Sequence, residues 1–225
     1  MKLEVIAKIR TDFPTKFGLP RQSGLVPELC GKIVFEKKYR NPQALRGLEG
    51  FSHIWLIWGF NLAKKEDWSP TVRPPRLGGN TRMGVFATRS PFRPNSIGLS
   101  CVKLEKIEGD TLYVSGIDLA DNTPIYDIKP YLPYADSHPD ATGGFAENVE
   151  PYMLEVEFDE ALLSLLPEDK REGAIGMLSQ DPRPSYNDDE NRIFGVEYAG
   201  YDVRFKVKNK TLTVCEVIKI KRDCQ

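Results

Sequence analysis

The sequence predicts a mainly β fold, in which a small β-barrel or pseudo-barrel domain is followed by a smaller α+β domain. Short apolar runs with the two-residue period of strands occupy much of the first half of the chain. Prolines divide the intervening chain into loops, an arrangement typical of small barrels and sandwiches. The composition changes near residue 136, so we expect one domain over residues 1–138 and a second over residues 150–225.

The expected elements of the first domain follow from local patterns. Residues 2–10 alternate as a half-buried strand, and Asn41 and Pro42 begin a short capped helix. Residues 51–60 are apolar on both faces, which indicates a central strand inside the core. Further strands are expected at residues 83–88, 97–106 and 111–116, the last two joined by a tight turn at Gly109-Asp110.

A linker rich in acidic and small residues is expected from Asp136 to Glu150. Beyond it, residues 153–158 alternate as a strand, and residues 160–166 and 169–178 have the pattern of short helices. Residues 203–207 and 212–220 form a predicted hairpin that turns at Asn209-Lys210.

Composition excludes several classes of protein. The chain has 225 residues, of which 40% are hydrophobic and 28% charged, as in ordinary globular proteins rather than disordered or fibrous ones. The first residues carry charge and no apolar run reaches membrane-spanning length, so we expect a cytoplasmic protein without membrane contact. Four scattered cysteines and two histidines predict neither a disulfide framework nor a metal site.

Charge is segregated although the net charge is only −1. Residues 68–104 contain no acid, but they contain six basic residues: Arg73, Arg76, Arg82, Arg89, Arg93 and Lys103. Arginines on proline-stiffened loops suit RNA phosphates, because the guanidinium group binds phosphate oxygens in pairs. The alternative is that these arginines pair with the acids crowded between Asp136 and Glu172.

Three other segments have the composition of a site. No Rossmann glycine motif or P-loop is present, so an ordinary Rossmann methyltransferase is not expected. Residues 86–100 are dense in proline, arginine and amide groups, which suits either a binding loop or a structural corner. Residues 118–134 interleave carboxylates and tyrosines, which suit ribose hydroxyls and base stacking. Alternatively, at least one of Asp118 and Asp121 makes turn hydrogen bonds, and Tyr131 and Tyr134 belong to the core. The rigid segment 180–186 either binds a ligand or simply ends a helix.

In order along the chain, residues 20–22, 45–49, 73–98, 118–133 and 180–186 closely resemble the TsaA-like family, also called the TrmO family. The resemblance implies a barrel-fold homodimer that uses S-adenosylmethionine to methylate the exocyclic nitrogen of threonylcarbamoyladenosine, at position 37 beside the tRNA anticodon. It also implies a set of cofactor contacts: Pro20, Arg21, Gln22, Asn61, Leu62, Arg89, Leu99, Asp118, Leu119, Ala120 and Asp121. Many relatives have His-Gln where this chain has Asn61-Leu62, so backbone contacts are expected there.

Methyl transfer from a sulfonium needs alignment more than acid or base chemistry, although loss of the proton from the attacking nitrogen helps. Candidates for a general base, by chemical type, are Tyr131, Asp127 and Asp136. Arg89 is expected to pair with the methionine carboxylate, and Asp118 or Asp121 to accept from hydroxyl or ammonium groups. The residues expected to contact the anticodon stem-loop are Arg73, Arg76, Arg82, Arg93 and Arg183. Two rival functions remain: a non-catalytic RNA-binding barrel, and a methyltransferase acting on another small molecule or on protein.

Overall fold

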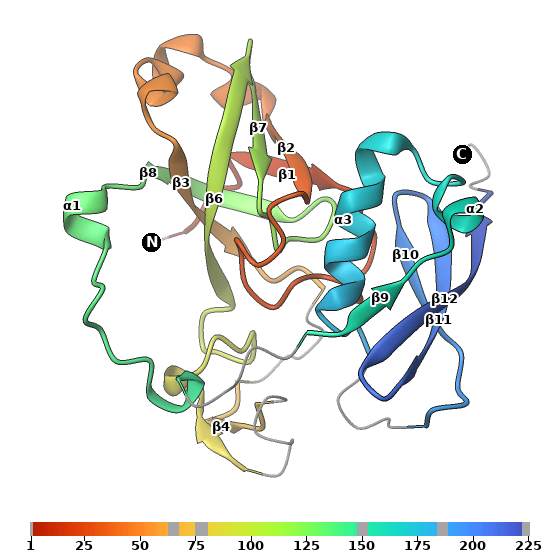
Figure 1. Ribbon diagram of the computed structural model, residues 1–225. Coiled ribbons are helices and arrows are strands. Elements are labelled where there is room, and N and C mark those ends of the chain that lie inside the picture. Colours follow the sequence, from red (N-terminus) through yellow and green to blue (C-terminus); the bar gives the residue numbers. More distant parts are fainter. Residues whose placement is uncertain (1, 63–67, 75–80, 148–152, 184–188, 222–225) are drawn as a thin grey trace.

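The computed structural model describes residues 2–62, 68–74, 81–147, 153–183 and 189–221. Six strands form a closed barrel in the order β1-β2-β7-β6-β3-β8, with antiparallel pairing throughout (Figure 1). They are β1 (Ala7–Thr11), β2 (Cys30–Phe35), β3 (His53–Gly59), β6 (Ile97–Glu108), β7 (Thr111–Ser115) and β8 (Pro124–Pro130). Pairing of β1 with β8 closes the ring. The predicted mainly β fold with a small barrel is therefore confirmed.

Alternation along β3 separates the inside of the barrel from its outer face. Ile54 and Leu56 are fully buried and Trp58 nearly so, whereas the residues between them are only half-buried. The prediction that both faces of this strand lie in the core was wrong, because a closed barrel encloses one face of each strand only. The register of β3 with β8 shifts between Ile57 and Trp58, a local irregularity of the kind often found beside functional sites.

Local elements agree with the sequence in part. The side chain of Asn41 accepts a 3.0 Å hydrogen bond from the amide of Gln43 at a short 3-10 helix, Pro42–Leu45, as predicted. The first strand begins only at Ala7. Instead of a strand over residues 83–88, β5 (Met83–Gly84) pairs with β4 (Thr71–Val72) and is followed by a 3-10 turn at Val85–Ala87. Two further 3-10 turns, Lys37–Tyr39 and Leu48–Gly50, lie between β2 and β3.

The C-terminal part is a four-stranded sheet with two helices. Its elements are β9 (Glu155–Glu157), α2 (Glu160–Leu163), α3 (Glu168–Ser179), β10 (Phe194–Tyr198), β11 (Tyr201–Lys208) and β12 (Thr211–Lys219), and the sheet order is β10-β11-β12-β9. The predicted turn is confirmed, since Asn209 and Lys210 both have positive φ values, 50° and 64°. Helix α1 (Pro133–Asp136) ends where the expected linker begins, and the linker contains a 3-10 turn at Gly144–Ala146.

Helix α3 lies between the barrel and the C-terminal sheet (Figure 1). A Cβ atom on Gly173 would lie 2.6 Å from the hydroxyl of Tyr198, so the helix approaches this closely only with glycine there. The ring of Tyr198 lies 5.2 Å from that of Phe13, and Lys170 forms a 2.8 Å ion pair with Asp12. Buried residues of both parts form one hydrophobic cluster. The loop that follows β1 is thereby held between the two parts, where it forms one wall of the site described next.

Among the described residues, no helix combines the length and the apolar character needed to cross a membrane.

Candidate functional site

A cavity of about 710 Å³ lies where the loops after β1, β3 and β7 meet the loop before β6. Its volume falls within the range of small-molecule sites. The cavity brings together most of the residues that the family resemblance assigned to a cofactor: Pro20, Arg21, Gln22, Asn61, Leu62, Arg89, Leu99, Asp118, Leu119 and Ala120. These residues come from four separate segments, so their meeting in one cavity is a property of the fold.

Trp58, at the end of β3, lines the apolar part of the cavity, together with Phe60 and Gly98. The rings of Trp58 and Phe60 lie 4.3 Å apart, and a Cβ atom on Gly98 would lie only 2.2 Å from the indole. Glycine at this position therefore lets the indole lie flat against the backbone of β6. Sequence analysis assigned Trp58 and Phe60 to a strand and no other role, although a buried tryptophan N–H usually finds an acceptor.

The indole N–H of Trp58 begins a short hydrogen-bonded chain. It donates to the Ser100 hydroxyl over 2.9 Å, and that hydroxyl donates to Oδ1 of Asp118 over 2.6 Å. Burial raises the pKa of Asp118 to about 6, against the opposing effects of the Ser100 hydrogen bond, backbone amides and the charge of Arg89. Asp118 is therefore largely ionised at pH 7. A bound cationic or hydroxyl group would compensate for the water that this carboxylate loses on burial.

Arg89 supplies positive charge at the same cavity. Its guanidinium donates a hydrogen bond to the side-chain oxygen of Gln22, which lies on the loop after β1. Arg89 is exposed, so its remaining N–H groups can reach a ligand carboxylate.

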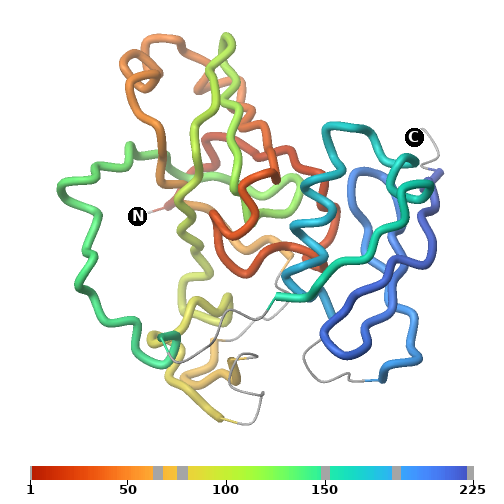
Figure 2. The backbone as a smooth tube through the Cα atoms, viewed as in Figure 1, coloured from red at the N-terminus to blue at the C-terminus, as the bar shows by residue number. Residues whose placement is uncertain are grey.

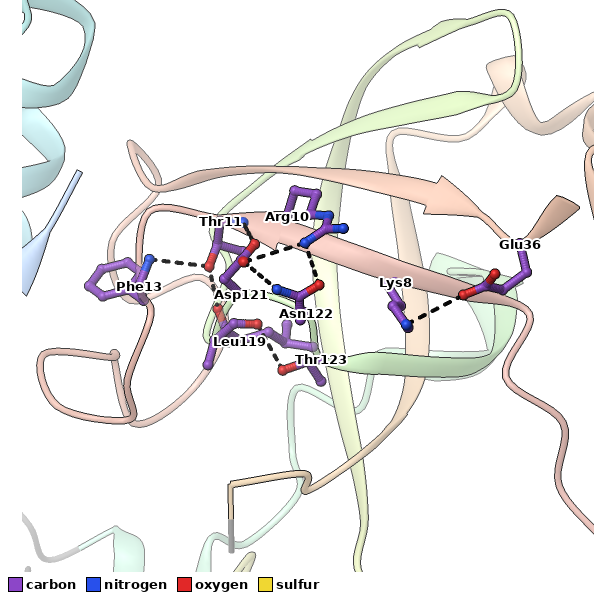
Figure 3. A network of polar contacts seen from close by, with 10 residues as sticks. Lys8, Arg10, Thr11, Phe13, Glu36, Leu119, Asp121, Asn122 and Thr123 are labelled. Atoms are coloured by element: carbon purple, nitrogen blue, oxygen red, sulfur yellow. Dashed lines mark hydrogen bonds and ion pairs between the residues drawn. The ribbon is translucent and has the colours of Figure 1, made fainter. Parts of the chain in front are cut away.

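Asp121 differs from Asp118, because it is not among the residues that line the cavity. Figure 3 shows its carboxylate accepting from the Thr11 amide at 3.1 Å and from the Asn122 side chain at 2.6 Å, with Arg10 at 3.5 Å. The carboxylate of Asp121 thus fastens the loop after β7 to β1. Asp121 thus has a structural role, but its amide hydrogen bond comes from β1 and is not the local turn hydrogen bond that was expected.

The three candidates for a general base lie outside the cavity. Asp136 accepts 2.9 Å hydrogen bonds from the Trp55 indole and from the Leu132 amide, and the ring of Tyr131 lies 5.8 Å from that of Trp55. Asp127 forms a 2.9 Å ion pair with Lys129 on β8. Since Trp55 alternates with the buried residues of β3, these groups gather on the outer face of the barrel wall.

The arginines expected to contact RNA divide into two kinds. Arg73 and Arg82 are exposed, and Arg82 donates to the Thr71 hydroxyl over 3.0 Å. Close by in the chain, the exposed rings of Trp68 and Phe86 stack 6.5 Å apart. Within the described parts of the chain, neither arginine forms an ion pair with an acid, so the alternative pairing with the acidic stretch gains no support. Arg76 lies outside the described residues.

Arg93 and Arg183 have structural contacts. Arg93 donates to the carbonyls of Val85 and Thr88 at 3.0 and 2.6 Å, and its guanidinium lies 5.7 Å from the centre of the Phe86 ring. Arg183 binds both carboxylate oxygens of Asp181 at 2.8 Å, and its side chain is only 11% exposed. Over the described ranges, no group of three or more His, Cys, Asp or Glu side chains is arranged to hold a metal ion.

Two family models match the chain. Residues 8–137 match the tRNA-methyltransferase O N-terminal domain, and residues 151–220 match the TrmO C-terminal domain. The chain is 42% identical to the tRNA (adenine(37)-N6)-methyltransferase of Escherichia coli strain K12, over 92% of this chain and 93% of that protein. It is 43% identical to a putative S-adenosylmethionine-dependent methyltransferase, RcsF, of Pseudomonas aeruginosa strain PAO1, over 89% of this chain and 90% of that protein.

The fold is also that of a solved structure. The crystal structure of TrmO from Pseudomonas aeruginosa superposes with a TM-score of 0.81 at 35% identity, and the match covers 96% of this chain and 97% of that one. Agreement over both the barrel and the C-terminal part shows that the whole arrangement is shared.

Proposed function

The chain belongs to the TrmO family of tRNA methyltransferases, and from this we propose that it methylates N6 of threonylcarbamoyladenosine at position 37 of tRNA, with S-adenosylmethionine as donor. The observation that carries the proposal is the cavity itself. All the residues that the family resemblance assigns to the cofactor, except Asp121, line this one space. A non-catalytic RNA-binding barrel is not supported, since the relatives are named methyltransferases.

The residues of the cavity fit this cofactor. Asp118 is placed to accept from an ammonium or ribose hydroxyl group, and Arg89 to bind the carboxylate. Trp58 and Leu99 supply apolar surface for the remainder of the molecule. Asn61 and Leu62, at the end of β3, are proposed to contact the cofactor through their backbone. When bound, the cofactor supplies an electrophilic methyl group.

The protein's main contribution is proposed to be alignment. Residues on four loops, held by the barrel, would fix the donor, so that the nucleophilic nitrogen needs only to approach in line. Asp118 is the one acid among the described residues that line the cavity. Tyr131, Asp127 and Asp136 remain proposals for the base, and from the outer face they would reach the reacting nitrogen only at the cavity of a second copy.

A homodimer is proposed on independent grounds. Figure 2 shows the chain beyond α1 running as an extended arc outside the barrel, and nearly all of residues 133–147 are exposed. Tyr134, in α1, is 87% exposed, and Leu99, which lines the cavity, is 52% exposed. Exposed apolar groups of this kind are typical of a surface that meets another chain. Light scattering on the purified protein should give twice the mass of the chain; a single-chain mass would exclude the dimer.

We propose that the anticodon stem-loop binds across the β4–β5 arm. Exposed arginines beside stacked aromatic rings suit RNA, because guanidinium groups bind phosphates while unpaired bases stack on rings. Arg93, which lies against Phe86, and Arg183, which follows the end of α3, already have protein partners and are also proposed to contact the RNA. We also propose that residues 1–138 form the cofactor-binding domain and residues 150–225 a second domain. The protein is proposed to act in the cytoplasm, where tRNA is modified.

The experiment that tests the function has two steps. Calorimetric titration with S-adenosylmethionine should show binding, and methyl transfer should then occur to tRNA that carries threonylcarbamoyladenosine but not to tRNA that lacks it. Transfer to a small molecule or protein without any tRNA would instead favour the third function considered above. Absence of cofactor binding would overturn the proposal.

A further inference from the structure

The loop after β1, residues 12–29, carries three of the proposed cofactor residues on a segment that forms no strand or helix. They are Pro20, Arg21 and Gln22. Ordering a segment of this kind costs conformational entropy, so it keeps one conformation only where other parts of the protein hold it. One side of the loop contacts the barrel, and the other contacts the C-terminal part of the chain.

On the barrel side, the loop is attached to both charged groups that are proposed to bind the cofactor. The Ser23 amide donates a hydrogen bond to the Asp118 carboxylate, and the Ser23 hydroxyl accepts from the Cys101 amide at 3.1 Å. The neighbouring Gln22 accepts from the guanidinium of Arg89. A displacement of the loop would therefore change the surroundings of the acid and of the arginine together.

On its other side, the loop packs against the C-terminal part at Gly18. This residue has a φ of 84°, and a Cβ atom on it would lie 2.5 Å from Cγ2 of Val196 on β10 and 3.2 Å from the sulfur of Met177 on α3. Both side chains belong to the hydrophobic core, with Val196 3% exposed and Met177 0%. The backbone of Gly18 is thus held by two core residues, only two positions before Pro20 in the cavity.

An ion pair and a backbone hydrogen bond hold the start of the same loop. Lys170 on α3 binds the carboxylate of Asp12 at 2.8 Å, and the Asp12 carbonyl accepts from the Ala199 amide at 3.0 Å. Both side chains of the ion pair are 26% exposed, so solvent ions screen it only in part. Among the described residues, none of the C-terminal part lines the cofactor cavity. These contacts with the loop are therefore its route to the cofactor.

We propose that Val196, Met177 and Lys170 are positioning residues for the methyl donor. They hold the loop after β1 in the conformation that binds S-adenosylmethionine. The inference rests on the proposed function and gives the C-terminal part of the chain a role in cofactor binding. If a loop adopts its binding conformation for only a fraction of the time, the affinity for its ligand is reduced by that fraction. Loosening these contacts should therefore weaken cofactor binding, although none of the three residues touches the cavity.

The first test uses the full-length protein and two valine variants of equal burial. Val196→Ala removes Cγ2, which packs against Gly18. Val207→Ala removes the same atoms from a residue that is also 3% exposed, but it lies on β11, four residues beyond Val203, the strand partner of Val196. Both variants should lower the midpoint of thermal unfolding by similar amounts.

Cofactor binding should separate the two variants. By calorimetry, we expect the dissociation constant for S-adenosylmethionine to rise about three- to tenfold in Val196→Ala and less than about twofold in Val207→Ala. The dissociation constant for a stem-loop RNA, measured by filter binding without cofactor, should stay within about twofold of the wild-type value in both. A merely structural loss would affect the two valine variants alike.

A pair of complementary changes tests the contact itself. Gly18→Ala places a methyl group close to Cγ2 of Val196 and should weaken cofactor binding about tenfold or more. In Gly18→Ala/Val196→Ala that methyl group gains space. The combined effect on the dissociation constant should therefore be smaller than the product of the two single effects.

Lys170→Gln loosens the start of the loop without opening a cavity in the core, so it remains informative if a core variant fails to fold. We expect it to raise the dissociation constant for S-adenosylmethionine about threefold. Lys206→Gln, which removes an exposed lysine of β11, is its control and should leave cofactor affinity unchanged.

Wild-type cofactor affinity in Val196→Ala or in Lys170→Gln would overturn the inference, as would equal weakening in Val196→Ala and Val207→Ala. Single effects that simply multiply in Gly18→Ala/Val196→Ala would also count against it, because the two residues would then act independently. Failure of the proposed function gives a different result, in which the wild-type protein itself does not bind S-adenosylmethionine.

Discussion

The Ser100 hydroxyl connects Asp118 to the barrel: it donates to the carboxylate over 2.6 Å while accepting from the buried Trp58 indole. Ser100 is 1% exposed and does not line the cavity, so it contacts Asp118 from the interior of the barrel. The only acid of the cavity within the described chain is therefore fixed in position by a residue that a ligand would not touch. Burial raises the pKa of Asp118 to about 6. Keeping this buried carboxyl ionised at pH 7 therefore lowers the free energy of unfolding.

Asp118→Asn should stabilise the protein while weakening cofactor binding. A folded-state pKa of about 6 exceeds the unfolded value of 3.8, so the folded state binds more protons between these pH values and stability falls as pH rises through that window. Asparagine keeps an acceptor for Ser100 and removes the charge. We expect a gain of about 1–3 kcal/mol in the free energy of unfolding above pH 6, shrinking toward pH 4.

Urea unfolding at several pH values and calorimetry with S-adenosylmethionine would check the two effects together. The dissociation constant should increase about tenfold or more. A variant that is both less stable at pH 7.5 and unchanged in cofactor affinity would contradict the assigned role of Asp118.

Ser100→Ala should shift the pH dependence of cofactor binding. Loss of the hydroxyl removes a hydrogen bond that lowers the pKa of Asp118, so that pKa should rise above 6 and binding should begin at higher pH. The indole N–H of Trp58 also loses its acceptor, which should cost about 1–3 kcal/mol of stability. Cofactor affinity measured between pH 5 and 8 gives the shift.

Ser115→Ala is the matched control. Ser115 is also a buried serine whose hydroxyl donates to a carboxylate, that of Glu105 at 2.5 Å, but it does not line the cavity. Its loss should reduce stability without moving the pH profile. Equal shifts in both variants would show that the effect comes from general loosening of the barrel.

Gly98→Ala should damage the cavity through Trp58. The added methyl group would lie 2.2 Å from the indole, a separation that forces the ring to move. We expect a loss of about 1–3 kcal/mol in the free energy of unfolding, together with weaker cofactor binding. Intrinsic fluorescence measures the unfolding, and calorimetry measures the binding. Gly84→Ala is the control, because nothing lies within 4 Å of a Cβ atom there and the backbone has φ −57°. A tolerated alanine at residue 98 would mean that Trp58 is not held against β6.

Strands were predicted where apolar alternation or a turn motif was clear, and missed where the outer face was polar. β8 carries Asp127 and Lys129 outward from a barrel wall in which Ile125 is fully buried. The interleaved acids and aromatics that suggested a site are in part this amphipathic alternation. β2 and β10 were also missed, since each contains a glycine that interrupts a short apolar run.

Most residues that line the cavity were predictable from family motifs, whereas the residues that support them from behind were not. Trp58 and Ser100 are 42 positions apart, and they meet only because β3 and β6 pair in a register that places Trp58 opposite Gly98. Spacing along a sequence does not define such a register until the strands and their order are known.

Lys210→Gly tests a turn that the sequence predicted. Lys210 has a φ of 64°, a conformation that glycine adopts without strain. We expect the variant to be about 0.5–1 kcal/mol more stable in urea unfolding. Lys208→Gly, within β11, should be destabilising instead, because glycine weakens a strand interior. A loss of stability in Lys210→Gly would place the turn in another conformation.

Replacing both exposed arginines of the β4–β5 arm should weaken RNA binding in a salt-dependent way. In Arg73→Gln/Arg82→Gln, two phosphate contacts are removed, so the slope of log affinity against log salt should decrease by about two. Filter binding of a stem-loop RNA at several salt concentrations measures this slope. Lys206→Gln/Lys208→Gln removes the same charge from exposed positions of β11 and should leave the slope nearly unchanged. Equal changes in both double variants would indicate that net charge alone governs binding, and the arm would lose its assigned role.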